Sequence, residues 1–253
     1  MSARPTPAVP PPADAPLSLA ERGRAADGAP LALDRRLFLH LLVFDGAPAD
    51  LAPLAAALTT ATPEALPVEA VLYADAHHPR GAALLTWAED PAAFTGPVRA
   101  FVGAGPFAAL ALRPERTLVG RTYTIGYESD LADALVGRPR RRLLDDALAW
   151  HLWYPVRRAG AFARLDAAEQ RAMLMEHGAI GRRFGEAGHA HDVRLAAHGL
   201  DTDDADFVVG ITAPTLTGAS ALVQAMRATR QTAEYLDRLG PFFVGHVAAR
   251  RRL

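Results

Sequence analysis

The strongest constraint on the fold is a pattern of apolar runs and amphipathic segments that occurs twice along the chain. In the first copy, runs of strand length and segments with a 3.6-residue apolar period alternate. Its order is strand, helix, strand, strand, helix and extended chain, at residues 35–44, 47–58, 68–75, 81–88, 90–105 and 107–128. This is the β-α-β-β-α-β order of a ferredoxin-like unit.

The same order returns in the second half of the chain. It comprises a strand, a helix, two strands, a helix and a last strand, at residues 149–156, 166–185, 191–199, 204–212, 218–240 and 241–248. Asp166 and Glu169 have the spacing of a helix-starting capping box, and Gly240 is a typical helix-ending residue. Each unit alone leaves one sheet face uncovered. The sequence therefore predicts an α+β fold of two tandem ferredoxin-like repeats forming a dimeric-α+β-barrel-type subunit.

The predicted units divide the chain into four parts. Residues 1–32 are rich in proline and alanine and are expected to be a flexible tail. Residues 33–128 form the first repeat and residues 148–253 the second. The charged segment between them, residues 129–147, is expected to be a linker or lid rather than core.

Charge and composition narrow the chemistry. A formal net charge of −1 gives no reason to expect nucleic acid or an anionic membrane as a partner. No apolar run approaches the roughly 18 residues of a membrane span, and the N-terminus lacks signal-peptide features, so we expect a cytoplasmic protein. Without cysteine, a metal must be held by histidine, carboxylate or tyrosine. Without lysine, Schiff-base chemistry is excluded.

The helix predicted at 166–185 carries a histidine on its apolar side. One face presents, at 3.6-residue spacing, Met173, His177, Ile180 and Phe184. Gly178 and Gly181 each cost a helix roughly 1 kcal/mol relative to alanine. Such small residues beside a buried imidazole leave space for something flat or bulky, and Arg182 and Arg183 could hold its carboxylates. The alternative is a core histidine bonded to a backbone carbonyl, with glycines that allow close helix packing.

The strand that follows this helix is unusually polar. Asp192, Arg194 and His198 are expected to share one strand face because strand side chains alternate. They could simply contain an Asp192–Arg194 ion pair, since buried charges need partners. They could also line a polar pocket inside the barrel, where His198 or Asp192 moves a proton.

Two further histidines form an HxH motif just before this face. His189 and His191 would place both rings on one strand face, which suits a divalent metal ion. A position at the surface or at a loop edge is the other interpretation.

Several motifs of the second half occur in an order and spacing that resemble the chlorite dismutase family. They are "MLMEHGAIGRRF", "HGLDTDDADFVV", "LVQAMRATRQTAEY" and "LGPFFVGH", and "WYPVRRAGAFARLDAAEQRAML" extends the match. The resemblance covers residues 148–248, whereas the first half matches only in its order of strands and helices. The family includes chlorite dismutases, coproheme decarboxylases and members without an assigned function, and it is built of two ferredoxin-like repeats per subunit.

The resemblance implies a haem site. It places the proximal ligand of the iron, in haem b or coproheme, at His177. It also implies that Tyr154 is the redox-active residue next to a propionate. A strand-end aromatic that packs and hydrogen-bonds its hydroxyl is the alternative for Tyr154. Arginines, Arg182 and Arg183 among them, would bind the propionates because the chain has no lysine.

The chain departs from the family pattern at two positions. Chlorite-splitting members carry an arginine on the open side of the iron. Here, alignment by the two flanking motifs gives either Asp192 or Ala190 at that position, with Arg194 close enough to substitute. The family glutamate that hydrogen-bonds the proximal histidine falls near Arg230, and Glu234 is out of register by about a helical turn.

The expected function is a peroxide-dependent haem or coproheme oxidoreductase acting on a small-molecule substrate. Its catalytic residues would be Tyr154, Asp192, Arg194 and His198. Chlorite turnover is expected to be weak or absent because an anion needs a well-placed cationic group. The resemblance also implies a homo-oligomer, often a pentamer. The alternative is a haem-free member whose barrel binds a small molecule or a non-haem divalent metal, the metal through some of His177, His189, His191, Asp192 and His198.

Overall fold

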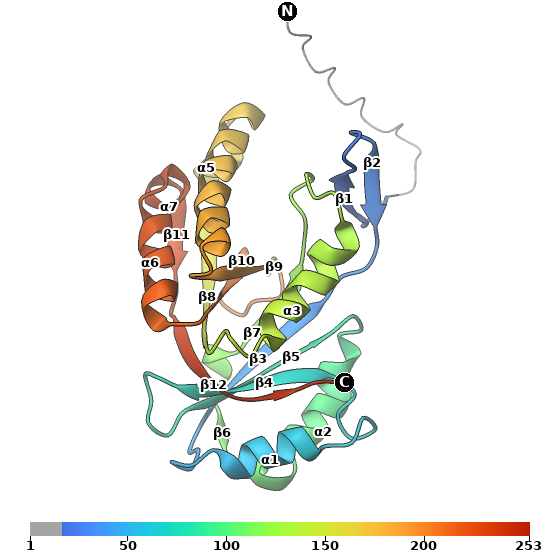
Figure 1. Ribbon diagram of the computed structural model, residues 1–253, viewed down its shortest axis with the longest axis vertical. Coiled ribbons are helices and arrows are strands. Elements are labelled where there is room, and N and C mark those ends of the chain that lie inside the picture. The colour runs from blue at the N-terminus through green and yellow to red at the C-terminus, as the bar shows by residue number, and fades with distance from the viewer. Residues whose placement is uncertain (1–16) are drawn as a thin grey trace, which may run out of the picture.

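A closed antiparallel barrel forms the centre of the computed structural model, which describes residues 17–253 (Figure 1). Its strands are β3 (Phe38–Asp45), β4 (Glu69–Asp75), β5 (Ala82–Ala88), β7 (Leu118–Thr122), β8 (Trp150–Arg158), β9 (His191–Ala196), β10 (Phe207–Ala213) and β12 (Phe243–Arg251). They pair in the order β7-β3-β5-β4-β12-β8-β10-β9, and β9 pairs with β7 to close the ring.

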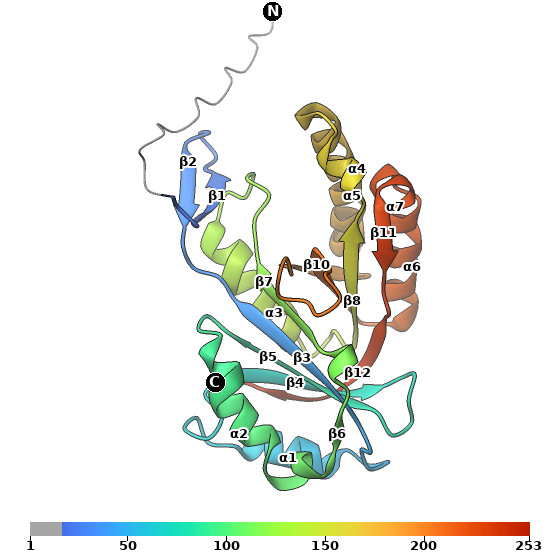
Figure 2. The same cartoon turned by 180° about the vertical axis from the view of Figure 1, so that it is seen from behind.

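Each half of this barrel is a ferredoxin-like unit, which confirms the predicted fold. The first half adds α1 (Ala52–Thr60) and α2 (Arg99–Val102), and the second adds α5 (Ala167–Glu186) and α6 (Leu216–Arg227). Both halves have the same internal strand order, β7-β3-β5-β4 in the first and β12-β8-β10-β9 in the second. The helices of the two halves lie outside the barrel, at opposite ends of the molecule (Figures 1 and 2).

Alternating side chains fill the inside of the barrel. The interior cluster is apolar and includes Leu39, Leu41, Leu85, Trp153, Val193, Leu195 and Phe243. Among its polar atoms, the Tyr73 hydroxyl lies 2.8 Å from Nδ1 of buried His151, while the buried indole nitrogen of Trp153 has no hydrogen-bond partner. The expectation of a polar pocket inside the barrel is therefore wrong, because large apolar side chains from both halves meet there.

The outer sheet faces pack against helices. In the first half, Leu54 and Leu58 of α1 are fully buried against a sheet face that carries Leu72 and Leu84. In the second half, the outer face includes Tyr154 and is covered by α5 and α6. Strand residues that point away from the barrel therefore meet a helix in both halves.

Shorter elements complete the fold. They are β6 (Ala111–Leu112), β11 (Leu236–Leu239), α4 (Gly160–Ala163), α7 (Arg230–Glu234) and single helical turns at Phe94–Val98, Gly105–Ala109, Pro114–Arg116 and Asp133–Gly137. The predicted helix 218–240 is too long: α6 ends at Arg227, Thr229 caps α7, and a strand follows. The strand forms because β12 pairs only with residues 150–153 of β8, which leaves residues 156–158 to β11.

The charged connector is a helix with fully buried residues, so the expectation that it lies outside the core is wrong. It is α3 (Arg138–Leu144), and the helical turn Asp133–Gly137 precedes it. Leucine and proline at four-residue spacing are buried along one face, at Leu131, Leu135, Pro139 and Leu143. The charged residues occupy the other faces, which is the ordinary arrangement of an amphipathic helix.

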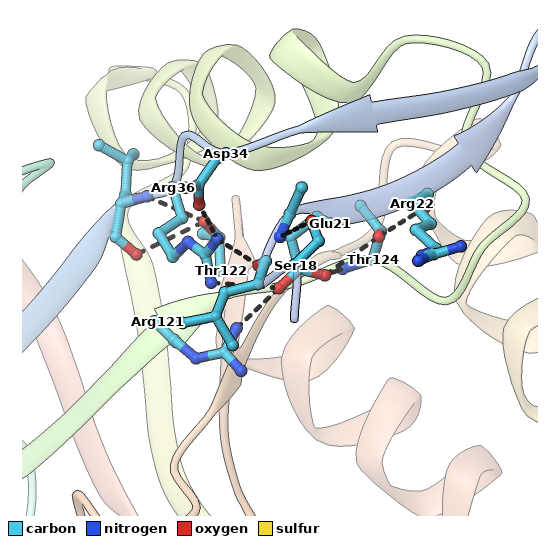
Figure 3. A network of polar contacts seen from close by, with 11 residues as sticks. Ser18, Glu21, Arg22, Asp34, Arg36, Arg121, Thr122 and Thr124 are labelled. Carbon is cyan, nitrogen blue, oxygen red and sulfur yellow. Dashed lines mark hydrogen bonds and ion pairs between the residues drawn. The ribbon is translucent and has the colours of Figure 1, made fainter. Parts of the chain in front are cut away.

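An N-terminal hairpin replaces part of the predicted tail. Residues 1–16 lie outside the described chain, but β1 (Glu21–Arg24) pairs with β2 (Pro30–Leu33). The Glu21 carboxylate, 13% exposed, accepts hydrogen bonds from Arg121 at 2.7 Å and from the Thr124 amide at 3.0 Å (Figure 3). This ion pair anchors the hairpin to β7, and composition alone did not predict it.

Membrane insertion by a helix finds no support in residues 17–253. The long helix α5 is largely polar, and no other helix there has the length and apolar character needed to cross a bilayer.

Candidate functional site

A cavity of about 610 Å³ lies outside the barrel, between α5 and α3. Its floor is the outer face of β8, β9 and β10, and α6 and β11 close one side. In Figure 1, α5 and α3 stand on either side of these strands. Small-molecule and cofactor sites typically measure roughly 300–1,000 Å³, so the volume suits such a ligand.

Strand register brings three of the predicted site residues onto the cavity floor. Tyr154 of β8 is opposite Val209 of β10, which is opposite Arg194 of β9. Asp192 belongs to the adjacent row, opposite Ile211. Side chains two residues apart share a face, and strands lie about 4.8 Å apart, so Tyr154 and Arg194 start about 10 Å apart across the floor.

His177 lines the cavity from the wall formed by α5. Its Nδ1 lies 3.3 Å from the hydroxyl oxygen of Thr229, and burial lowers the pKa of the imidazole. His177 is therefore neutral at pH 7 and is bonded to a side chain rather than to a backbone carbonyl. A Cβ added to Gly178 would meet nothing within 4 Å, which agrees with the space that the sequence predicted beside this histidine.

Two arginines hold Asp192 in the cavity. Arg194 donates through Nε to one carboxylate oxygen at 3.0 Å, while Arg142 of α3 lies 3.3 Å from the other and also donates to the backbone carbonyl of Asp192. Burial alone would raise the pKa of Asp192, but the two guanidinium groups outweigh it and hold that pKa below its usual value. Asp192 is therefore ionised, and the cluster carries a net positive charge.

Arg158 presents an unsatisfied donor to the same cavity. Its guanidinium lies between the rings of Phe162 and Phe207, 4.3 Å and 4.7 Å from their centroids. The buried Nε has no hydrogen-bond partner, and neither has the buried Oε1 of Gln231, which also lines the cavity. An arginine fixed by two aromatic rings with a free N–H is prepared for an anionic group.

Tyr154 supplies a neutral phenol to the floor. Its ring stacks on Phe242 with centroids 4.3 Å apart. Burial, followed by the charge of Asp192, raises the pKa of the phenol, so Tyr154 keeps its proton at neutral pH.

Arginine dominates the charged lining. The cavity is lined by Arg138, Arg142, Arg158, Arg182, Arg194 and Arg227, against the carboxylates of Glu186 and Asp192. Of the two arginines predicted to bind carboxylates, only Arg182 lines the cavity. Arg183 is on an exposed face of α5. This excess of guanidinium groups favours a ligand with carboxylate groups.

Two predicted site histidines lie elsewhere. Strand β9 ends at Ala196, so His198 is in the following turn, 59% exposed and 3.2 Å from Asp206. Its predicted place beside Asp192 is wrong. His189 precedes the strand and is exposed, so it does not share a strand face with His191, which lines the cavity.

The structure also distinguishes Ala190 from Asp192, the two positions that the sequence alignment left open. Ala190 is fully buried in the helix–sheet packing, and the position that faces the cavity is Asp192.

Within residues 17–253, no three His, Asp or Glu side chains converge closely enough to hold a metal ion. The non-haem metal alternative therefore gains no support from the geometry.

Two cavity residues, and the side chain that contacts His177 from behind, were not predicted from sequence. Arg158 follows Tyr154 by four residues and thus shares its strand face, so alternation could have found it. Arg142 was hidden in the presumed linker, although the buried-residue spacing of that segment indicates a helix. Thr229 gave no signal, because its contact with His177 joins two helices distant in sequence.

The structure combines two features. Two ferredoxin-like units close into one barrel, and a histidine on a helix lies over an arginine-rich cavity. The sequence pattern of the family described as chlorite dismutase matches residues 114–248, more than half of the chain. The chain belongs to the chlorite dismutase family.

Solved structures share this fold. A mutant chlorite dismutase from Candidatus Nitrospira defluvii is 15% identical, with a TM-score of 0.64 over 85% of this chain and 92% of that one. A heme-binding protein from Thermus thermophilus is 19% identical, with a TM-score of 0.63 over the same shares of the two chains. No curated protein sequence matches the chain significantly.

Proposed function

We propose that this protein binds haem b or coproheme in the cavity through His177 and acts as a peroxide-dependent oxidoreductase. The observation that carries the proposal is a neutral imidazole, held through Nδ1, on the wall of an arginine-lined cavity of about 610 Å³. Neutral imidazole is a common axial ligand of haem iron. The heme-binding relative from Thermus thermophilus supports the same choice of cofactor.

The residues present suit such a group. The unpaired Nε of Arg158 and the guanidinium of Arg182 could bind propionates, and the empty space beside Gly178 admits a flat ring next to α5. His177 would be the metal ligand. Haem, when bound, supplies the one-electron chemistry with peroxide, and the protein supplies orientation and charge.

Two residues on the cavity floor would transfer electrons and protons. We assign to Tyr154 the redox-active role, because it lines the cavity that would hold the haem. It would give an electron to the peroxide-oxidised cofactor, and because burial keeps the phenol neutral it would release its proton at the same time. Asp192 is ionised and could accept a proton at a carboxylate oxygen, although its two arginine partners weaken it as a base. We assign to Arg194 the role of holding Asp192, to which its Nε donates. His198 is not assigned a role, since it lies outside the cavity.

The contacts of Asp192 change the reason for expecting slow turnover of chlorite. Asp192 does not present a bare carboxylate to an anion, because Arg142 and Arg194 neutralise it. Both guanidinium groups, however, are already bonded to that carboxylate, and an entering chlorite must compete for them. We therefore still expect slow oxygen release from chlorite, for this reason rather than for simple repulsion.

Titration with hemin and with coproheme tests the binding step. The wild-type protein should develop a Soret band, and His177→Ala should abolish or shift it. His198→Ala is the matched control, because it removes an exposed histidine outside the cavity and should leave the titration unchanged. Absence of a Soret band from the wild type, or an identical titration of His177→Ala, would refute haem ligation by His177. Copper, zinc or iron without porphyrin in the purified protein would favour the non-haem metal alternative.

Two assays test the reaction. The haem-loaded protein is given chlorite while oxygen is followed, and the coproheme complex is given peroxide while product mass is followed. We expect little oxygen in the first assay and a Tyr154-dependent product in the second, which Tyr154→Phe should remove. Fast oxygen release would contradict the assignment of Asp192 to the open side of the site.

Assembly and compartment stay predictions. A homo-oligomer, with a pentamer as the arrangement that the family resemblance implies, is checked by light scattering at micromolar concentration. A monomer there would contradict it. Cytoplasmic location is checked by fractionation of the native source.

A further inference from the structure

Thr229 joins the cavity histidine to the helix behind it. It lies where α6 ends and α7 begins, and its side chain is buried, with 1% of the residue exposed. Its hydroxyl oxygen lies 2.7 Å from the carbonyl oxygen of Met226 and 3.3 Å from Nδ1 of His177. Within α7 it also contacts Thr232, at 3.2 Å from the hydroxyl and 3.4 Å from the backbone amide.

The hydroxyl of Thr229 has a single proton to donate and two lone pairs that accept. Its shortest contact is with the Met226 carbonyl, which can only accept, so we place the proton in that bond rather than in the longer contact with the Thr232 hydroxyl, which can itself donate. The Thr232 amide can only donate, which makes Thr229 an acceptor on its other side. Nδ1 of His177 must therefore carry the proton in its contact with Thr229, which leaves a lone pair on Nε2.

Nδ1 of His177 has no carboxylate as its partner. Glu234, the acidic residue of α7, is exposed and paired with Arg230 at 3.1 Å. The charged groups that act on His177, chiefly Asp192, Arg194, Arg158 and Glu176, act through charge alone and form no hydrogen bond with the ring within residues 17–253. The ring is thus held by one neutral hydroxyl.

We propose that Thr229 is a positioning residue that fixes His177 as the Nδ1–H tautomer and reserves Nε2 for a metal. A carboxylate at this place would pull on the Nδ1 proton and make the imidazole a more basic ligand, whereas a hydroxyl does so weakly. Iron bound here would have a higher reduction potential than iron whose histidine ligand bonds to a carboxylate. The statement about iron rests on the proposed function, while the tautomer belongs to the protein without cofactor.

Ring nitrogen-15 shifts of His177 in the cofactor-free protein test the tautomer. The wild type and Thr229→Ser should show a protonated Nδ1 and an unprotonated Nε2, since both keep a hydroxyl. Thr229→Val, of nearly the same shape, should show a mixture or the opposite tautomer. An Nε2–H ring in the wild type, or no change in folded Thr229→Val, would overturn the proposal. Circular dichroism and the amide spectrum establish that each variant is folded.

Haem loading tests the consequence for a ligand. Thr229→Val should bind hemin on the order of 10- to 100-fold more weakly, which is the usual effect of losing such an orienting partner. Thr229→Ser should retain wild-type affinity, and Thr229→Asp should lower the reduction potential of the bound iron. Equal affinity of the Val variant together with an unchanged potential in the Asp variant would refute the role of Thr229. Failure of the wild type itself to bind haem would refute the proposed function and leave the tautomer result standing.

Discussion

The two ferredoxin-like halves share one topology, but the large cavity lies over the outer sheet face of the second. In the first half, α1 has nine residues and presents two fully buried leucines, Leu54 and Leu58, to the sheet. In the second half, α5 has 20 residues, and Met173 is its one buried residue. The longer helix therefore buries fewer of its own side chains, and the unfilled volume beside it is the cavity.

The difference comes from the residue types that face each other. The sheet face of the first half offers Leu72 and Leu84 to aliphatic side chains, which pack at the density of a protein interior. The floor of the second half offers Tyr154, Asp192 and Arg194 to a helix face that carries glycines and His177. These polar and charged side chains bind one another and offer little aliphatic surface, so the helix does not pack tightly on this floor. A shared fold thus says little about function, and the poorly filled layer identifies the site.

The largest effect is expected from making a cavity in the first half. Leu58→Ala should lower the free energy of unfolding by about 2–5 kcal/mol, because Leu58 is fully buried and its neighbours cannot close the gap. Ile180→Ala, on the partly buried face of α5, should cost clearly less. Urea unfolding measures both variants. Equal losses of unfolding free energy would contradict the conclusion that the helix–sheet layer is tightly packed in the first half and loosely packed in the second.

Lowering the pH should destabilise the protein through His40, which is buried in the first half. Burial lowers the pKa of His40 from 6.5 to about 4, and its Nδ1 has no hydrogen-bond partner. The unfolded chain therefore takes up a proton below about pH 6.5, while the folded protein does so only below about pH 4. His40 thus makes stability fall with decreasing pH, by about 3 kcal/mol between pH 8 and pH 4.

His40→Leu isolates this contribution from that of the carboxylates. Unfolding free energies of the wild type and the variant are compared from pH 8 to pH 4. The variant should lose less stability over that range, since leucine binds no proton. Parallel profiles for the two proteins would show that His40 titrates normally in the folded state.

In the second half, removal of a cavity charge should affect binding more than folding. Arg158→Leu should weaken hemin binding by roughly 1.5–3 kcal/mol, or about ten- to a hundredfold, because a charge-assisted hydrogen bond is lost. Arg183→Leu removes the same charge from an exposed face of α5 and should leave the affinity unchanged. The two dissociation constants are measured by Soret titration. Similar losses in both variants would indicate a general effect of net charge.

The smallest effect is a gain of stability at the empty cavity wall. Gly178→Ala should raise the free energy of unfolding by about 1 kcal/mol, because alanine favours the helix and its Cβ meets nothing within 4 Å. Gly181→Ala should gain less, since its Cβ would lie 3.3 Å from Met226. Thermal unfolding of the two variants measures the difference. A loss of stability in Gly178→Ala would mean that the space beside His177 is already filled.

Local signals predicted most elements correctly. The Asp166 cap is as predicted, with its carboxylate accepting from the amides of Ala168 and Glu169. Predictions failed where a distant partner decides the structure. The extension of the second-half helix to Gly240 is an example, because Leu236–Leu239 becomes a strand only beside the free edge of β8. The N-terminal hairpin is another, since Glu21 needs Arg121, 100 residues away, as its partner.

The sequence by itself determined the repeated unit, the helix that carries His177 and the alternation that places Asp192 and Arg194 on one face of their strand. These follow from periodicities of 3.6 and 2 residues, which are local properties of the backbone. Only the tertiary structure decided that the cavity lies outside the barrel, that Arg142 neutralises Asp192 and that Thr229 orients His177. Each of these contacts joins residues about 50 positions apart, and their distances depend on how the barrel closes and how the helices pack on it.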